Sequence, residues 1–175
     1  MNLLDSLKIE APSAKEEESC GVEVLMQETR NQKFVDYVLG ECDKNCASLA
    51  VDFVGFINTY QHLAKIIPQR YHIYDIGCAW GFQHVFFRHH ASYTGVECPP
   101  KPIDVCPEQV NPIAFYPNAR FVLEEFTQSY TSGNLEIKEP AFGISNLAIG
   151  YGPCQEEAEA IFNKAFVCKY FIRYI

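Results

Sequence analysis

The hydrophobic pattern in the first third of the chain is helical. Apolar residues recur every three or four positions over residues 22–39 and again over residues 45–67, with Gly40 and Pro68 as terminators. Residues 1–20 are polar and lack this pattern, so we expect a mobile or loosely docked tail. The acidic run near the end of this tail would also suit the start of the first helix.

The pattern then alternates between strands and helices. Residues 71–74 and 92–96 are rich in β-branched and aromatic side chains, as strands are, whereas residues 82–89 place apolar side chains at helical spacing. Residues 75–81 contain two glycines and predict a turn, and Glu97 ends the second strand. The order strand, turn, helix, strand and acid is half of a nucleotide-binding βαβ unit.

The remaining pattern predicts three more strands and one helix. The strands cover residues 118–126, 141–148 and 167–175, and an amphipathic helix covers residues 155–166. We therefore expect one α/β domain over residues 21–175, in which the N-terminal helices (21–68) precede a core (69–175) with a mainly parallel sheet.

The predicted turn has features that suit an adenosine ligand. Gly77 and Gly81 lack a Cβ atom, so a ligand can approach the backbone, and a helix behind the turn would point its positive end at that ligand. Glu97 can accept both hydroxyls of a ribose. It lies 22 residues after Asp75, close to the separation of about 20 expected between a glycine turn and a ribose acid.

The motif Asp75-x-Gly77-x-Ala79-x-Gly81, followed by Glu97 at the end of the next strand, resembles the first two motifs of class I S-adenosylmethionine-dependent methyltransferases. Ala79 stands where the family usually has its second glycine. The nicotinamide fingerprint has a different glycine spacing. The resemblance implies a Rossmann-like three-layer α/β sandwich with sheet order 3-2-1-4-5, and S-adenosylmethionine as the cofactor.

The resemblance also implies roles for single residues around the cofactor. Asp75 would orient the turn or reach the amino group through water, and Glu97 would hold the ribose. Glu125 would bond the adenine amino group while Phe126 flanks the ring, with Glu124 as the competing acid. The methionine portion would lie against the residues of the turn, which are Gly77, Cys78, Ala79 and Gly81.

The fourth predicted strand carries the expected substrate side. Ser145-Asn146-Leu147-Ala148 with Tyr151 resembles the motif of small-molecule methyltransferases, in which the strand end lies under the methyl group. Asn146 and Tyr151 would shape that site. We therefore expect a methyltransferase acting on a small molecule, with a catalytically inactive cofactor-binding, regulatory or assembly protein as the alternative.

Catalytic residues are not assigned, because an in-line methyl transfer depends mainly on the placement of the reacting atoms. A histidine at position 84, 89 or 90 could act as a base, although a surface or core position explains each of them as well. Six prolines within residues 98–117 exclude a long helix there, with room for one or two turns over residues 107–115. We expect the rest to be a loop over the adenosine side.

Composition narrows the classes of partner. The formal net charge of −8 disfavours nucleic acid and anionic membranes as partners. We find no signal peptide and no stretch that could span a bilayer, so we expect a cytoplasmic protein. The eight cysteines lack C-x-x-C spacing, which favours buried thiols over a metal site.

The fifth predicted strand has an apolar edge. Full members of the family carry two further strands beside it, whereas this sequence stops at Ile175. An uncovered edge invites pairing with another chain. We expect either a homodimer through this edge or cover from the N-terminal helices.

Overall fold

The computed structural model describes residues 47–98, 112–146, 148–149 and 155–172, and for residues 47–54 and 114 the backbone alone. The predicted tail and the helix predicted over residues 22–39 lie outside the described residues. The chain divides into two compact units, Met1–Thr59 and Tyr60–Ile175. Helix α3 (Ala47–Ile66) begins in the first unit and ends in the second.

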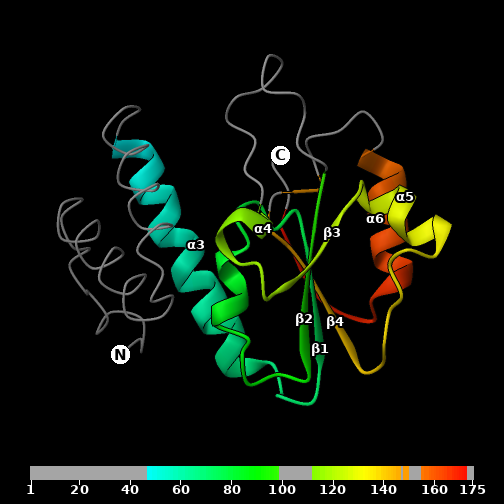
Figure 1. The fold of residues 1–175 in the computed structure, drawn as a ribbon, viewed down its shortest axis with the longest axis horizontal. Helices are drawn as coiled ribbons and strands as arrows, with labels where there is room; N and C mark the ends of the chain where they lie inside the picture. Colours follow the sequence, from blue (N-terminus) through cyan, green and yellow to red (C-terminus); the bar gives the residue numbers. More distant parts are fainter. Residues whose placement is uncertain (1–46, 99–111, 147, 150–154, 173–175) are drawn as a thin grey trace, which may run out of the picture. The chain divides into compact units, whose positions relative to one another are not determined.

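The second unit is built on five parallel strands (Figure 1). They are β1 (His72–Ile76), β2 (Ser92–Glu97), β3 (Arg120–Leu123), β4 (Ala141–Asn146) and β5 (Cys168–Ile172). Their order is β3-β2-β1-β4-β5, and every pairing is parallel. The predicted Rossmann-like α/β fold and its strand order are therefore confirmed.

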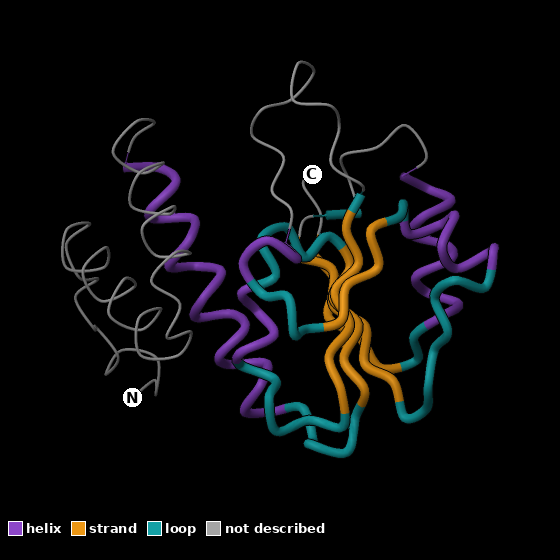
Figure 2. Tube along the Cα trace, viewed as in Figure 1, coloured by secondary structure: helices purple, strands orange, loops and turns teal. Residues whose placement is uncertain are grey.

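Helical segments cover both faces of this sheet (Figure 2). Helices α5 (Phe126–Ser132) and α6 (Gln155–Ala165) lie on one face. The opposite face carries the 3₁₀ helix η2 (Phe82–Val85) and the one-turn helix α4 (Pro112–Phe115). The turn in α4 agrees with the prediction for residues 107–115, of which residues 107–111 lie outside the described residues.

An aromatic core fills the α5 and α6 side of the sheet. Phe162 and Phe166 are fully buried, with ring centroids 5.1 Å apart. Gly143 of β4 admits the Phe166 ring, because a Cβ atom at Gly143 would lie 2.4 Å from that ring. Burying such a side chain contributes roughly 1.5–3 kcal/mol, so this cluster anchors α6 to the sheet. Its remaining buried members are Tyr74, Ile76, Val96, Phe126, Leu135, Ala141 and Ile149.

The helix predicted over residues 82–89 is wrong, because η2 ends at Val85 and turns follow it. Gln83, Val85 and Phe87 are all buried. An α-helix separates residues two apart by about 200°, so it could not bury this alternating set on one face. The turn before η2 therefore lacks the long helix expected behind it.

Two other boundaries differ from the prediction. Strand β1 continues through Asp75 to Ile76, so Asp75 belongs to the strand and not to the turn. Strand β3 ends at Leu123, and helix α5 starts at Phe126, the residue at which we expected the strand to end. Glu125 caps the first turn of α5, and Gly133 stops the helix in the left-handed conformation, with φ of 83°.

Candidate functional site

The turn after β1 alternates between ordinary and left-handed backbone conformations. Gly77, Ala79 and Gly81 have φ angles of 75°, 45° and 73°. Val96 at the end of β2 accepts hydrogen bonds from the N–H groups of Gly77 (2.7 Å) and Cys78 (3.2 Å). These two bonds fix the start of the turn to the neighbouring strand, so the turn and the end of β2 form one structural element.

Glu97 folds back onto this turn. Its Oε2 accepts a hydrogen bond from the Ala79 N–H at 2.7 Å, and its Oε1 accepts one from the Cys98 N–H at 3.0 Å. Burial raises the pKa of Glu97, and these two hydrogen bonds oppose the rise. The structure thus brings together the acid and the turn that the sequence analysis paired, with a backbone N–H directly on the carboxylate.

The glycines of the site also serve packing within the chain. A Cβ atom at Gly77 would lie 2.0 Å from the Cβ of Ala148. Cβ atoms at Gly81 and Gly95 would lie 2.5 and 2.7 Å from the ring of Phe121. Phe121 of β3 therefore lies across both glycines, and the small residues permit this close approach whether or not a ligand binds.

Asp75 lies in the interior beneath the turn. Its side chain is fully buried, its Oδ1 accepts a hydrogen bond from the Tyr60 hydroxyl, and its Oδ2 accepts one from the Tyr93 hydroxyl, both at 2.8 Å. Burial raises its pKa to about 7, against the opposing effect of the two tyrosine hydroxyls, and the charge of Glu97 adds to the rise. Asp75 therefore joins α3, β1 and β2 in this structure.

Cys78 is a buried thiol in the same turn. A Cβ atom at Gly95 would lie 2.6 Å from its Sγ, so Gly95 makes room for the sulfur. Burial raises the pKa of Cys78 well above its ordinary value, and the charges of Asp75 and Glu97 act in the same direction. The thiol is therefore neutral at pH 7 and packs as a small apolar group.

Two residues of η2, Gln83 and His84, lie against the turn and were not assigned to the site from the sequence. The Gln83 side chain is buried, and within the described residues its Oε1 atom has no hydrogen-bond partner. His84 places Nδ1 2.9 Å from the Gly81 carbonyl oxygen and packs its ring against Tyr116, with centroids 4.6 Å apart. Nδ1–H is the donor to Gly81, because a carbonyl oxygen can only accept. Burial lowers the pKa of His84, and the bond to Gly81 opposes this effect.

The other two candidate histidines have ordinary surroundings. His89 is exposed and accepts a hydrogen bond from Arg88 at 3.4 Å. His90 places Nε2 3.0 Å from the carbonyl oxygen of Ile67 and packs against Phe87. Of the three, His84 is therefore the one that contacts the turn.

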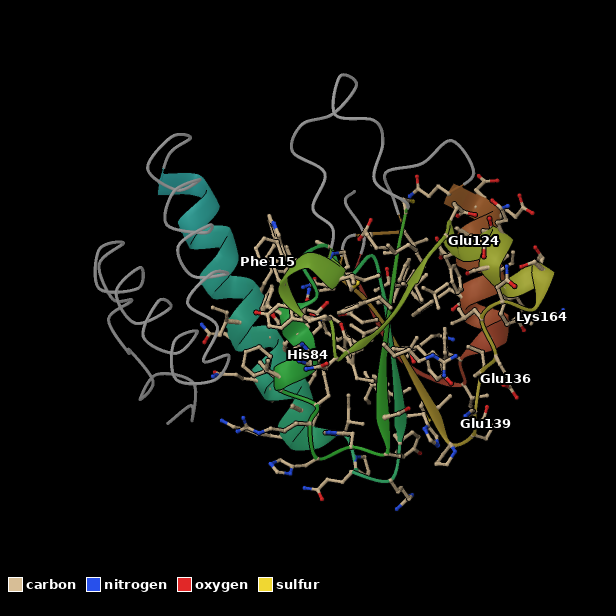
Figure 3. The ribbon with its side chains drawn as sticks, in the orientation of Figure 1. His84, Phe115, Glu124, Glu136, Glu139 and Lys164 are labelled. Carbon is tan, nitrogen blue, oxygen red and sulfur yellow. The ribbon has the colours of Figure 1, made fainter. Side chains whose placement is uncertain are left out.

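The two acids proposed for adenine have partners within the chain. Glu125 caps α5, because its carboxylate accepts hydrogen bonds from the Gln128 N–H at 2.9 Å and from the Thr127 hydroxyl. Glu124 accepts a hydrogen bond from the Asn134 side chain at 3.0 Å. Figure 3 shows Glu124 beside α5 and His84 on η2, on opposite sides of the sheet.

The residues proposed to flank the adenine ring and the methyl group lie at separate places. Phe126 is 5 % exposed and packs edge-on against Phe162, with centroids 6.2 Å apart, so it contributes to the core. Asn146 ends β4, in register with Ile172 of β5, and is half-buried. Tyr151 lies outside the described residues.

The structure thus gathers one part of the predicted site at the ends of β1 and β2. This part contains Glu97 and the turn from Gly77 to Gly81. The network around Asp75 was missed because its partners are 15 and 18 residues away in sequence. Tyr93 is the one member of this network that the strand pattern could have indicated, because it lies two positions before Gly95 and therefore on the same face of β2.

No protein-family model matches this chain, and no curated protein and no solved structure matches it. Within the described ranges, no group of three or more His, Cys, Asp or Glu side chains is placed to hold a metal ion. Across the same part of the chain, every helix is too short or too polar to cross a membrane.

Proposed function

We propose that the chain binds S-adenosylmethionine at residues 77–81 and transfers its methyl group to a small molecule in the cytoplasm. The observation that carries this proposal is the contact between the Glu97 carboxylate and the turn, at 2.7 Å from the Ala79 N–H. An acid in this position can exchange its backbone partner for the two hydroxyls of a ribose.

The sheet topology supports the same place. In the order β3-β2-β1-β4-β5 the direction of chain progression reverses between β1 and β4. Open parallel sheets bind ligands beyond the carboxyl ends of their strands at such a switch point. The turn follows β1 and Asn146 ends β4, so both lie at that edge of the sheet.

The reaction that we propose needs placement more than acid–base chemistry. A nucleophile on the substrate forms a bond to the methyl carbon while the bond from that carbon to the sulfonium breaks. The electron pair of the broken bond stays on sulfur and gives S-adenosylhomocysteine, and the nucleophile loses its proton to solvent or to a base. Alignment of the reacting atoms at about 3 Å can supply several kcal/mol of the barrier reduction.

The first prediction concerns Glu97. Calorimetric titration of the wild-type chain should detect S-adenosylhomocysteine binding and no comparable binding of NADH. Glu97→Ala should weaken binding about 10- to 100-fold, since hydrogen bonds to a charged group contribute about 1.5–3 kcal/mol. Glu136→Gln, at an exposed position between α5 and β4, is the control and should bind as the wild type does.

The outcomes separate the parts of the proposal. Affinity that Glu97→Ala leaves unchanged, in a variant that keeps the wild-type circular dichroism spectrum, would remove the ribose assignment. Absence of binding by the wild type to both S-adenosylmethionine and S-adenosylhomocysteine would remove the function altogether.

A second candidate is a protein that binds the cofactor without turnover. The position of Phe121 favours it, because the ring fills the space over Gly81 and Gly95. The two tyrosine hydroxyls on Asp75 favour it as well, since they occupy both carboxylate oxygens. A methyl-release assay with a cell extract decides between the two: binding without release of S-adenosylhomocysteine supports this second candidate.

A further inference from the structure

Tyr93 on β2 contacts residues at both ends of the turn. Its hydroxyl donates a hydrogen bond of 2.8 Å to Oδ2 of Asp75, two residues before Gly77. Its ring centroid lies 6.2 Å from that of His84, with an angle of 57° between the two ring planes. His84 places Nδ1 2.9 Å from the carbonyl oxygen of Gly81, the last residue of the turn. One side chain of β2 therefore connects both ends of residues 77–81.

The ring of Tyr93 belongs to a small aromatic group at the end of the turn. Phe87 stacks on it, with centroids 5.9 Å apart and an angle of 15° between the planes. His84 also packs against Tyr116, with centroids 4.6 Å apart. All these separations lie in the range in which aromatic rings attract one another. The Tyr93 ring thus supplies one of the two described ring contacts of His84.

At the start of the turn, the hydroxyl of Tyr93 shares its acceptor with Tyr60. Tyr60 donates to Oδ1 of Asp75 at 2.8 Å, so each carboxylate oxygen accepts from one tyrosine. Asp75 is fully buried, and β1 continues from it for one residue before the turn begins. The ring of Tyr60 packs against Phe82 and Phe87. The two tyrosines therefore act alike on Asp75 but differ in what their rings contact.

The register of the sheet explains why Tyr93 reaches Asp75. Parallel pairing of β1 with β2 places Asp75 opposite Gly95. Tyr93 lies two residues before Gly95, and side chains two positions apart on a strand share one face of the sheet. We propose that Tyr93 is a positioning residue for the turn, which holds Asp75 through its hydroxyl and His84 through its ring.

The titration of Asp75 reports on the hydroxyl of Tyr93. Burial raises the pKa of Asp75 to about 7, and the hydrogen bonds from the two tyrosines oppose the rise. Loss of one bond to the ionised carboxylate should therefore raise its titration midpoint further. The residue in register on β4 is the apolar Ile144. The titratable groups around Asp75 are Tyr60 on α3, Tyr93 and Glu97 on β2, and Cys78 in the turn.

The tautomer of His84 reports on the ring of Tyr93. Donation to the Gly81 carbonyl requires the proton on Nδ1, and the hydrogen bond of a histidine sets which of its nitrogens is protonated. A His84 ring that leaves Gly81 is no longer restricted to this tautomer. Both readouts are measured with no cofactor present, so a failure of this inference is distinct from a failure of the proposed function.

The experiment is nuclear magnetic resonance on the whole chain, with a pH titration of the Asp75 carboxyl carbon and the ring nitrogen shifts of neutral His84. Tyr93→Phe keeps the ring and should raise the Asp75 midpoint by about one to two pH units, while His84 keeps its proton on Nδ1. Tyr93→Leu removes the ring as well and should also give His84 a mixture of both tautomers. Tyr60→Phe is the matched control, because it removes the other donor to Asp75. It should raise the midpoint and leave the His84 tautomer unchanged.

Two results would overturn the inference. One is an Asp75 midpoint that Tyr93→Phe leaves unchanged, and the other is a folded Tyr93→Leu in which His84 still carries its proton on Nδ1 alone. If Tyr93→Leu does not fold, nuclear Overhauser contacts between the ring at position 93 and His84 in Tyr93→Phe take its place. Their presence supports the ring contact, and their absence overturns it.

Discussion

Ala79 adopts a backbone conformation that favours glycine. Its φ of 45° is in the left-handed region, which costs a non-glycine residue about 1–2 kcal/mol. Its N–H bonds the Glu97 carboxylate, and this bond offsets part of that cost. Ala79 thus adopts a backbone conformation that a glycine would adopt without strain.

We predict that Ala79→Gly stabilises the protein by up to about 1 kcal/mol. Relief of the left-handed conformation should exceed the greater backbone entropy that glycine loses on folding, roughly 0.5–1 kcal/mol. Urea unfolding should show a higher midpoint with an unchanged slope. Ala160→Gly, inside α6, is the matched control and should destabilise by about 1 kcal/mol. Equal destabilisation by both substitutions would contradict the strain at Ala79.

Asp75 predicts an unusual dependence of stability on pH. Its pKa is about 7 in the folded protein, against 3.8 for an ordinary aspartate, so the folded state holds the proton more tightly than the unfolded chain. The stabilisation is fully present below about pH 4 and is lost as the pH rises through 7. Between pH 5 and 8 the wild type should lose about 3 kcal/mol relative to Asp75→Asn. Parallel stability curves for the two proteins would show that burial does not perturb Asp75 in this way.

At the residue scale, the sequence was informative where the relevant contacts are set by strand register. Glu97 ends β2, and parallel pairing with β1 brings it beside the turn. Tyr60 donates to Asp75 from 15 residues earlier in the sequence, and no local pattern encodes that contact. The same reason explains why Gln83 and Phe121 were missed.

At the scale of elements, the amphipathic helix α6 and the presence of all five strands were predicted, because each has one dominant period, whereas several strand ends were not. Helix α6 matches its prediction to within one residue, at Gln155–Ala165. The short elements η2 and α5 were not found. Helix α5 is seven residues long and begins after Glu125, and glutamate is not among the preferred N-cap residues, so the start signal was absent from the sequence.

Glu125 allows the role of a helix cap to be separated from a role in binding adenine. Burial acts to raise its pKa, but the hydrogen bonds from Thr127 and Gln128 outweigh it, so the pKa is lowered. We predict that Glu125→Ala costs about 1 kcal/mol at pH 7, as loss of an N-cap does, and speeds hydrogen exchange at the Gln128 N–H. Urea unfolding and hydrogen exchange measure the two effects.

The neighbouring Glu124 provides the matched control for this test. Its side chain accepts one hydrogen bond at an exposed pair, so Glu124→Ala should cost no more than about 0.5 kcal/mol. Titration of both variants with S-adenosylhomocysteine then tests the two registers proposed for adenine. A specific loss of affinity in one variant assigns the acid, and equal affinity in both leaves Glu125 as a cap alone.

For the whole molecule, the alternation of strands and helices was sufficient to predict the sheet, because parallel neighbours need crossover connections and these follow one hand. What covers the edges of the sheet could not be predicted, because the sequence of an edge strand does not indicate which element lies beside it. Strand β5 pairs with β4 alone within the described sheet. Ile172 on β5 is 40 % exposed, and Val167 just before it is 92 % exposed.

We propose that two copies of the chain pair through β5, with cover by the N-terminal helices as the alternative. Unpaired N–H and C=O groups on an exposed edge favour addition of another strand, and a lysine on the edge opposes it. Ile172→Lys should therefore convert a dimer into a monomer in sedimentation, whereas Val167→Lys, outside the strand, should leave the dimer intact. A wild-type chain that sediments as a monomer at every concentration, with β5 amides protected from hydrogen exchange, would instead support intramolecular cover, because protection without a partner requires another part of the same chain on that edge.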